Sequence, residues 1–298
     1  MLRNFDELKA RVLAAKTPKV IALAAAADEH SLEAVRDAVR ELGVDYLLVG
    51  DADAIRKVAA DVGFDVDALK IVQAADDVEA AETAVRLVRE GKADILMKGK
   101  LQTGALLKAV VDKEYGIRKG GLMSHVAVLE SPHYHKLLYV TDGGMVTGPD
   151  AAQKRGILEN CVDFLNQMGY DAPKVAALAA VEVVNPKMQE TVDADALAKQ
   201  NACGEIKNCI VGGPLSFDLA ISAESAKIKG FASDVAGDAD VLLAPDMATG
   251  NILAKALIYL GGAKMAGCVL GATAPIVLVS RGATAEEKML SIMLTMAV

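Results

Sequence analysis

The segment from Ala274 to Ile292 concentrates groups that can hold and transfer an anionic fragment. It reads APIVLVSRGATAEEKMLSI, in which an apolar strand pattern is followed directly by Ser280 and Arg281. A helix pattern then begins, with Glu286 and Glu287 in its first turn. An arginine guanidinium can bind two phosphate oxygens at once, and a neighbouring carboxylate can accept a proton. Because open α/β folds bind ligands at the carboxyl ends of their strands, the segment predicts a phosphate-binding site beside a general base.

A structural role for Glu287 is also consistent with this segment. Thr284 is a favourable N-cap residue, and Glu287 lies three residues later, which is the spacing of a capping box. Acidic side chains also stabilise the first turn of any helix. The capping and the catalytic interpretation of Glu287 therefore both stay open, whereas an arginine placed directly after a strand favours ligand binding.

Length and composition indicate a folded protein of two ordinary domains. The chain has 298 residues, of which 53% are hydrophobic and 24% charged, and its net charge is −8. The basic residues are scattered, which argues against nucleic acid as a partner. No signal peptide or membrane span is recognisable, so we expect a cytoplasmic protein that does not bind membranes. The cysteines and histidines lack metal-ligand spacing, so no metal site is predicted.

Short apolar runs alternate with helix patterns along the whole chain, which is typical of parallel βαβ units. We expect an α/β protein with two doubly wound domains, mostly parallel sheets and an interdomain cleft. The predicted strands are Val20–Ala24, Tyr46–Val49, Lys70–Val72, Ile95–Met97, Val126–Leu129, Leu137–Thr141, Val175–Ala180, Cys209–Val211, Val241–Ala244 and Ile276–Val279. The predicted helices between and after them are His30–Leu42, Ala52–Val62, Val78–Glu90, Thr103–Val111, Ala151–Gly169, Pro186–Gln200, Gly250–Tyr259 and a terminal helix from Ala285.

Several predicted strands end in short glycine-rich loops that lead into helices. Backbone amides at such helix starts can bind phosphate without any side chain. No P-loop and no GxGxxG dinucleotide motif is present, so phosphate must be bound in another way. The substrate-binding candidates on these loops are Lys98, Gly99, Lys100, Thr103, Gly250 and Asn251.

The chain resembles the phosphate acetyl/butyryltransferase family, and within it the butyryl-transferring members most. The resemblance covers essentially the full length. It is carried by LVGD at 48–51, KAD and MKG at 92–99, MSHVAV at 123–128, TDGG at 141–144, VEVVNPKM at 181–188, GGPLSFDLA at 212–220, TGN at 249–251 and VSRG at 279–282.

The resemblance implies reversible transfer of a short acyl group, butyryl or branched, between coenzyme A and inorganic phosphate. It implies that Ser280 and Arg281 hold the acyl phosphate. The family's thiol-activating aspartate lies seven residues after that serine, where this chain has Glu287, and the adjacent Glu286 is the alternative base. Coenzyme A would be a substrate, no cofactor would be tightly bound, and the protein would be a homo-oligomer.

The resemblance also implies that the C-terminal segment returns to the first domain. Together with a change in sequence character near residue 137, it predicts a first domain of residues 1–137 plus 275–298 and a second of residues 138–274. Direct thiolate attack in a ternary complex is expected, since Ser280 has no nearby histidine base and no GxSxG elbow exists.

Other functions stay open at this point. The acyl group could be acetyl, which would make the protein a phosphate acetyltransferase. An acyltransferase that uses acyl carrier protein would need a basic docking face, and a decarboxylating dehydrogenase would need clustered aspartates for a metal. A non-catalytic two-domain protein that binds a phosphorylated ligand is the alternative outside the enzymes.

Overall fold

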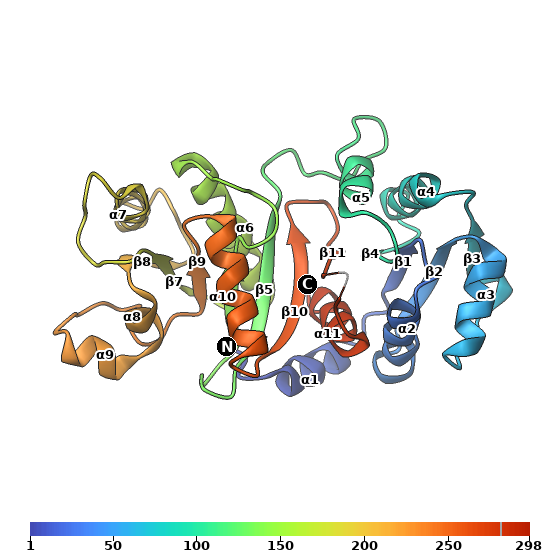
Figure 1. Ribbon diagram of the computed structural model, residues 1–298, viewed down its shortest axis with the longest axis horizontal. Coiled ribbons are helices and arrows are strands. Elements are labelled where there is room, and N and C mark those ends of the chain that lie inside the picture. Colours follow the sequence, from blue (N-terminus) through green and yellow to red (C-terminus); the bar gives the residue numbers. More distant parts are fainter. Residues whose placement is uncertain (281) are drawn as a thin grey trace. The chain divides into compact units, whose positions relative to one another are not determined.

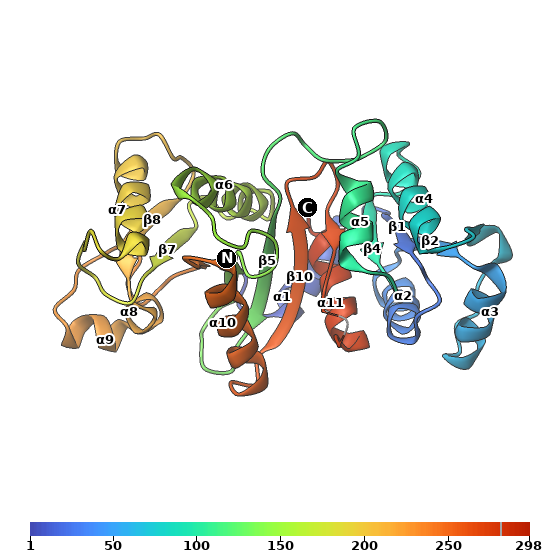
Figure 2. The same cartoon turned by 45° about the horizontal axis from the view of Figure 1, so that its top comes forward.

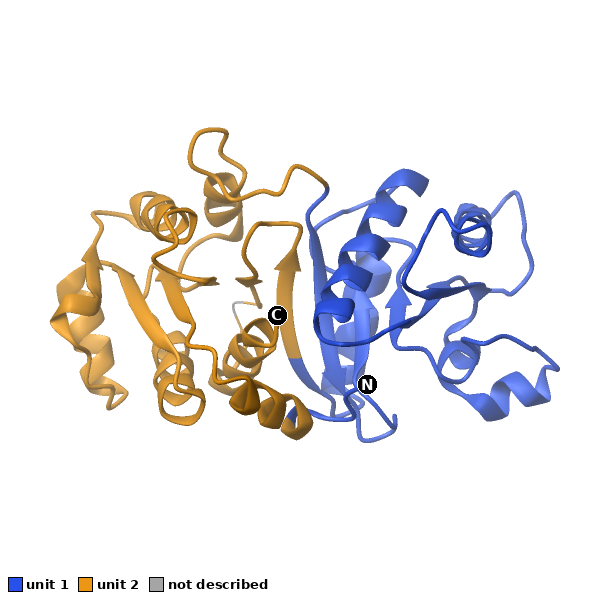
Figure 3. Ribbon diagram, turned by 180° about the vertical axis from the view of Figure 1, so that it is seen from behind, with its two compact units in different colours: residues 1–5, 122–265 blue, residues 6–121, 266–298 orange. Residues whose placement is uncertain are grey.

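The computed structural model describes residues 1–280 and 282–298, which divide into two compact units (Figure 3). Unit 1 comprises residues 1–5 and 122–265, and unit 2 comprises residues 6–121 and 266–298. The sequence instead suggests breaks after residues 137 and 274, and that division stays a prediction.

Unit 2 is an α/β unit with a mostly parallel sheet. Its elements are α1 (Phe5–Ala15), β1 (Val20–Ala24), α2 (Glu29–Leu42), β2 (Asp45–Gly50), α3 (Ala52–Asp61), the short 3-10 helix η1 (Ala68–Lys70), β3 (Ile71–Gln73), α4 (Asp77–Arg89), β4 (Ile95–Lys98), α5 (Thr103–Val110), β10 (Lys264–Leu270), β11 (Ile276–Val277) and α11 (Ala285–Met296). The strand order is β3-β2-β1-β4-β11-β10, and β10 is antiparallel to its neighbour β11. Helices α4 and α5 cover one face, and α2, α3 and α11 cover the other (Figure 1).

Unit 1 repeats this architecture with a shorter sheet. Its elements are β5 (Ser124–Glu130), β6 (Leu138–Thr141), α6 (Ala151–Gln167), β7 (Lys174–Leu178), α7 (Gln189–Ala202), β8 (Ile210–Leu215), α8 (Phe217–Ile221), α9 (Ala223–Ile228), β9 (Val241–Leu243) and α10 (Met247–Tyr259). The strand order is β5-β6-β9-β7-β8, in which β5 and β6 form an antiparallel hairpin and the other pairs are parallel. Helices α6 and α7 cover one face, and α8, α9 and α10 cover the other (Figure 2).

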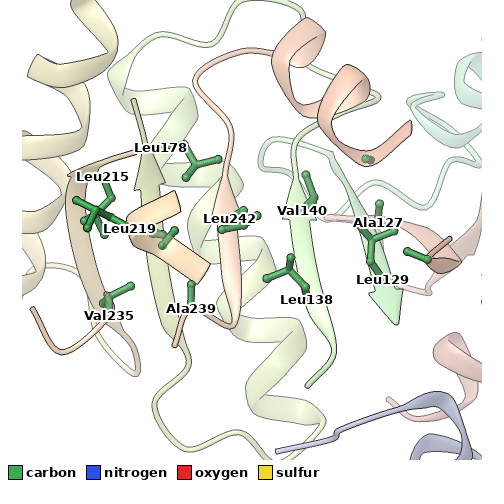
Figure 4. Packing of buried hydrophobic residues seen from close by; sticks show 14 of the residues in the cluster. Ala127, Leu129, Leu138, Val140, Leu178, Leu215, Leu219, Val235, Ala239 and Leu242 are labelled. Atoms are coloured by element: carbon green, nitrogen blue, oxygen red, sulfur yellow. The ribbon is translucent and has the colours of Figure 1, made fainter. Parts of the chain in front are cut away.

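The central strands are buried on both faces, as parallel strands in α/β proteins are. Residues Ile21–Ala24 of β1 and all of β4 are buried. In unit 1 a contiguous core joins Leu138 and Val140 of β6 with Leu178 of β7 and Leu242 of β9 (Figure 4). Each fully buried leucine contributes about 1.5–3 kcal/mol of transfer free energy, so these strands are held mainly by apolar packing.

The helix ends follow local rules that the sequence already contains. Asp28 is the N-cap of α2 and accepts a hydrogen bond from the Ser31 amide at 3.0 Å. The same helix ends at Gly43, whose φ of 69° is the left-handed conformation that glycine adopts most readily.

The predicted α/β class with mostly parallel sheets is confirmed. The predicted elements all occur, and besides them the structure contains α1, η1, β10 and the short helices α8 and α9. Strand β10 reads KMAGCVL, and its glycine and small residues weaken the strand signal. Within the described part of the chain, no helix is long and apolar enough to cross a membrane.

Candidate functional site

The predicted site residues of unit 2 gather at one edge of its sheet. Strands β1, β4 and β11 are neighbours and run parallel, so their carboxyl ends meet at the same edge. The helices that follow β1 and β4 cover opposite faces of the sheet, so these two strands form a topological switch point (Figure 1). Ligands of doubly wound folds bind in the crevice at such a point.

Gly99 fits tightly against the end of β1. Its amide donates to the Ala24 carbonyl at 2.9 Å, and the next amide, of Lys100, donates to the Ala25 carbonyl at 2.9 Å. A Cβ atom at position 99 would lie 2.3 Å from the Ala25 carbonyl oxygen, a contact that backbone atoms cannot relieve. Glycine is therefore required here for close backbone approach, which fixes the loop after β4.

The two lysines that flank Gly99 have different surroundings. Lys98 is buried, and its Nζ donates to the carbonyls of Gly99 at 3.1 Å and Leu101 at 3.2 Å. Lys100 is exposed and lines two cavities of unit 2, of about 180 and 500 Å³. Lys98 thus orders the loop, whereas the Lys100 side chain is accessible to a ligand. Thr103 is half-buried and is the first residue of α5.

Ser280 follows β11 on an exposed turn. Its carbonyl accepts a hydrogen bond from the Ala283 amide at 3.1 Å, and its Oγ accepts one from the Gly282 amide at 3.4 Å. The hydroxyl therefore lies at the exposed surface of this edge. Arg281, the predicted phosphate-binding residue, lies outside the described residues.

The capping interpretation of Glu287 is confirmed. Its Oε2 accepts a hydrogen bond from the Thr284 amide at 2.7 Å, and its own amide donates to Thr284 Oγ1 at 3.2 Å. Glu286 precedes it on the exposed side of the first turn of α11 and is not part of the capping box. The catalytic roles of both carboxylates stay predictions.

A buried ion pair that the sequence did not predict anchors this segment. Lys288 Nζ donates to Asp28 Oδ2 at 2.5 Å and to Ser31 Oγ at 2.9 Å, which joins the first turn of α11 to the start of α2. Burial opposes ionisation of the Asp28 carboxyl, but hydrogen bonds from Lys288 and Ser31 outweigh it, so the pKa of Asp28 lies below its usual value. One signal was available in the sequence, because a lysine in the first turn of a helix opposes the helix dipole and needs a partner.

The two remaining candidates, Gly250 and Asn251, lie in unit 1 at the start of α10. Asn251 Nδ2 donates to the Gly143 carbonyl at 2.9 Å, and a Cβ on Gly250 would lie 2.6 Å from the Asp142 carbonyl oxygen. Buried Asp142 accepts hydrogen bonds from the amides of the loop that follows it. These contacts hold the loop after β6 against the start of α10, and substrate binding by Gly250 and Asn251 stays a prediction.

Among the residues that the structure describes, no group of three or more His, Cys, Asp or Glu side chains is arranged so that it could hold a metal ion. The candidate residues contribute backbone amides, hydroxyls, lysines and carboxylates. Such groups can bind a phosphate and move a proton.

Comparison with known proteins gives near full-length matches. The sequence profile described as phosphate acetyl/butaryl transferase matches residues 73–296. A phosphate butyryltransferase of Clostridium acetobutylicum is 44% identical, over 99% of this chain and 97% of that protein. A phosphate acetyltransferase of Thermotoga maritima is 43% identical, over 93% of this chain and 94% of that protein. The crystal structure of a branched-chain phosphotransacylase from Enterococcus faecalis V583 has a TM-score of 0.82 and 32% identity, over 94% of this chain and 98% of that one.

Proposed function

Since this chain belongs to the phosphate acetyl/butyryltransferase family, we propose that it transfers a short acyl group reversibly between coenzyme A and inorganic phosphate. The observation that carries the proposal is the placement of Ser280 and the start of α11 at the switch-point edge of unit 2, within a chain that matches the family along nearly its whole length.

The thiol of coenzyme A needs help to react at neutral pH. By analogy with cysteine its pKa is about 8.5, so most of it is protonated. A carboxylate within hydrogen-bond distance can accept the proton as the sulfur attacks the acyl carbon of the acyl phosphate. The bond between the acyl carbon and the phosphate oxygen then breaks, and phosphate leaves as an anion.

We assign the base role to Glu286. Glu287 Oε2 already accepts a hydrogen bond from the Thr284 amide, and that bond must persist for α11 to keep its cap. Glu286 is exposed in the same turn and has no part in the cap. Arg281 is proposed to hold the phosphate oxygens, because its fork can bind two of them while phosphate departs.

Direct transfer in a ternary complex needs no acyl-enzyme. Ser280 Oγ accepts from the Gly282 amide, and no histidine lies within ten residues of it in the sequence to activate it as a nucleophile. We therefore propose that Ser280 binds the acyl phosphate and is not acylated. Initial-rate plots against both substrates should intersect, and parallel lines would reject direct transfer.

The deciding experiment measures thiol release. Purified protein is mixed with acetyl-, butyryl- or isobutyryl-CoA, with and without phosphate, and free thiol is detected with Ellman reagent. Phosphate-dependent release is expected, with the largest kcat/KM for butyryl or branched chains. Absence of release with every acyl-CoA would contradict the proposed function and favour a binding protein.

Two further expectations belong to this proposal. Coenzyme A is expected to be a dissociable substrate, so dialysis of the protein should not reduce its activity. The cytoplasm stays the predicted compartment. A homo-oligomer is expected as well, and it is supported by exposed Ile252 and Tyr259 on α10 and exposed Leu260 directly after it. Light scattering on the protein as it elutes from a size-exclusion column would give the mass of the assembly. A monomer at micromolar concentration would contradict this expectation.

A further inference from the structure

The basic residues look scattered along the sequence, but the fold of unit 2 gathers six of them on one surface. Residues 86–119 contain nine Lys and Arg and four Asp and Glu, which gives this stretch a net charge of +5. Because the whole chain has a net charge of −8, the remaining residues carry −13. The six residues, all of them exposed, are Arg86, Arg89, Lys108, Lys113, Arg118 and Lys119. We call them the amino-edge surface.

The amino-edge surface lies away from the candidate site. Helix α4 leads into the start of β4, so its last residue, Arg89, lies at the amino ends of the parallel strands. Arg89 Nη1 donates to the Gly116 carbonyl at 2.8 Å, which places the loop 111–121 at the same edge. The Thr273 amide, shortly before β11, donates to the Ile117 carbonyl at 2.7 Å and confirms this placement. The candidate residues that follow β4 and β11 lie at the opposite, carboxyl edge of the sheet.

The arginines of this surface are held in place before any partner binds. The guanidinium carbon of Arg86 lies 4.0 Å from the centroid of the Tyr115 ring. Arg118 Nε donates to the Gly121 carbonyl at 3.1 Å, and its Nη2 donates to the Gly120 carbonyl at 3.1 Å. A guanidinium has five N–H donors, so these contacts leave several of them for a partner. Because the side chains are already ordered, binding a partner costs less conformational entropy.

Few carboxylates offset the positive charge. Within the described part of the chain, none of the six side chains forms an ion pair. The carboxylate of Asp112 stabilises the loop by accepting hydrogen bonds from the amides of Glu114 at 2.8 Å and Tyr115 at 3.1 Å. These hydrogen bonds, together with the charges of Arg86 and Arg89, hold the pKa of Asp112 below its usual value. The surface therefore keeps a positive potential in a protein that is otherwise negative.

We propose that the amino-edge surface binds an acidic segment of a partner protein. Arginine forks bind carboxylates through two parallel hydrogen bonds, and free lysine ammonium groups add charge around them. Val111 lies between Lys108 and Lys113 in the sequence and is 44% exposed, so it offers an apolar contact beside the charges. Protein interfaces combine such apolar contacts with a polar rim. The proposal does not depend on acyl transfer.

Other anionic partners fit this surface less well. A nucleic acid strand extends beyond six side chains and would meet the negative remainder of the protein, which repels it. Basic surfaces that bind anionic membranes carry exposed aromatic or leucine side chains that enter the lipid. Here the only aromatic residue of the loop 111–121 is Tyr115, which is half-buried beneath Arg86. An acidic protein segment is short enough to match the surface and needs no such anchor.

The test is fluorescence anisotropy of a short labelled poly-L-glutamate peptide with the full-length protein. We expect binding at low salt that weakens about tenfold or more between roughly 20 and 200 mM NaCl, because salt screens exposed charges. Lys113→Glu combined with Lys119→Glu reverses two charges of the surface and should weaken binding about tenfold or more. The matched control combines Lys57→Glu with Lys227→Glu, two exposed lysines outside the surface. It changes the net charge equally and should weaken binding less than about twofold.

Lys108→Glu provides a second variant in case the double substitution disturbs the loop. Lys108 lies on α5, outside the loop, and its reversal should weaken binding about threefold or more. Poly-glutamate that does not bind, or that binds these variants as tightly as the control, would overturn the proposal. Tighter binding of single-stranded DNA or of phosphatidylserine vesicles, lost in the double variant, would overturn it too, because the partner would then be a nucleic acid or a membrane.

The thiol-release assay separates this surface from the candidate site. The double variant at Lys113 and Lys119 should keep kcat and the KM for acyl-CoA within about twofold of the control. A higher KM for acyl-CoA in the double variant alone would assign the surface to the phosphates of coenzyme A and overturn the proposal. If poly-glutamate binds as expected but no acyl-CoA releases thiol, the amino-edge surface stands and the proposed function falls.

Discussion

The ion pair between Asp28 and Lys288 permits a sharp test of how α11 is held in place. Asp28→Asn removes the negative charge and leaves an N-cap residue of similar quality, so the start of α2 should persist. The Lys288 side chain is only 7% exposed, while that of Asp28 is 24% exposed. The substitution therefore leaves a buried ammonium without its counter-charge.

The expected loss of unfolding free energy follows from this geometry. Removing one partner of a buried pair costs about 3–5 kcal/mol. Asp28 is partly solvated, and Ser31 Oγ, 2.9 Å from Lys288 Nζ, can still accept a hydrogen bond. Both effects reduce the loss, and we expect about 2–3 kcal/mol for Asp28→Asn. That is a large part of the stability of an ordinary domain, which is about 5–15 kcal/mol.

The assay is urea unfolding followed by far-UV circular dichroism, since the chain contains no tryptophan. Asp53→Asn is the control, because Asp53 pairs with Arg56 in the same unit but its side chain is 97% exposed. The control should change stability by less than about 0.5 kcal/mol. Combining Asp28→Asn with Lys288→Met should restore part of the loss, because the uncompensated ammonium is then gone.

The pH dependence has a defined sign. The pKa of Asp28 is lowered in the folded protein, so its contribution is complete above the unfolded value of 3.8 and is lost as the pH falls through the folded pKa. The difference in stability between the natural protein and Asp28→Asn should accordingly shrink below pH 4. Two results would refute the reasoning. One is a stability difference between the natural protein and Asp28→Asn that stays constant down to pH 2. The other is a double variant whose loss of unfolding free energy equals the sum of the losses in Asp28→Asn and Lys288→Met.

Three further predictions concern the site. Arg281→Lys keeps the charge but loses the fork, so kcat should fall about 100-fold or more with an unchanged unfolding curve, and an unchanged rate would remove Arg281 from the mechanism. Glu286→Gln should lower kcat about 100-fold in the thiol-release assay. Glu287→Gln can still cap α11, so it should lower kcat less than about tenfold. The reverse order of the two effects would assign the base role to Glu287. In urea unfolding, Gly99→Ala should destabilise the protein by about 3 kcal/mol or more, because the added Cβ meets a backbone oxygen. Gly104→Ala is the control, because its added Cβ meets nothing within 4 Å, and it should stabilise the protein by about 0.5 kcal/mol.

Much of the local structure could be predicted from the residues. The capping box of Thr284 and Glu287 was recognisable because a cap depends on side chains three residues apart. The strand Val20–Ala24 was predicted with its observed bounds, since a buried parallel strand is a short apolar run. Strand β10 was not predicted, because its glycine and small residues weaken the strand signal and its pairing with β11 forms only in the fold.

The surroundings of the site residues could not be predicted in the same way. Lys98 reads like an exposed loop lysine, yet its Nζ is buried on two loop carbonyls. The need for glycine at position 99 arises from the end of β1, a segment more than seventy residues earlier in the chain.

The sequence by itself determined the α/β class, the order of the elements and the candidate residues at the strand ends, because hydrophobic period and capping are properties of neighbouring residues. Only the tertiary structure decided that Lys288 pairs with Asp28, 260 residues away, and that Lys154 and Gln189 both donate to the buried Asp193 carboxylate. Burial and the distance between two charges are set by how the helices pack on the sheet, and no local pattern encodes them.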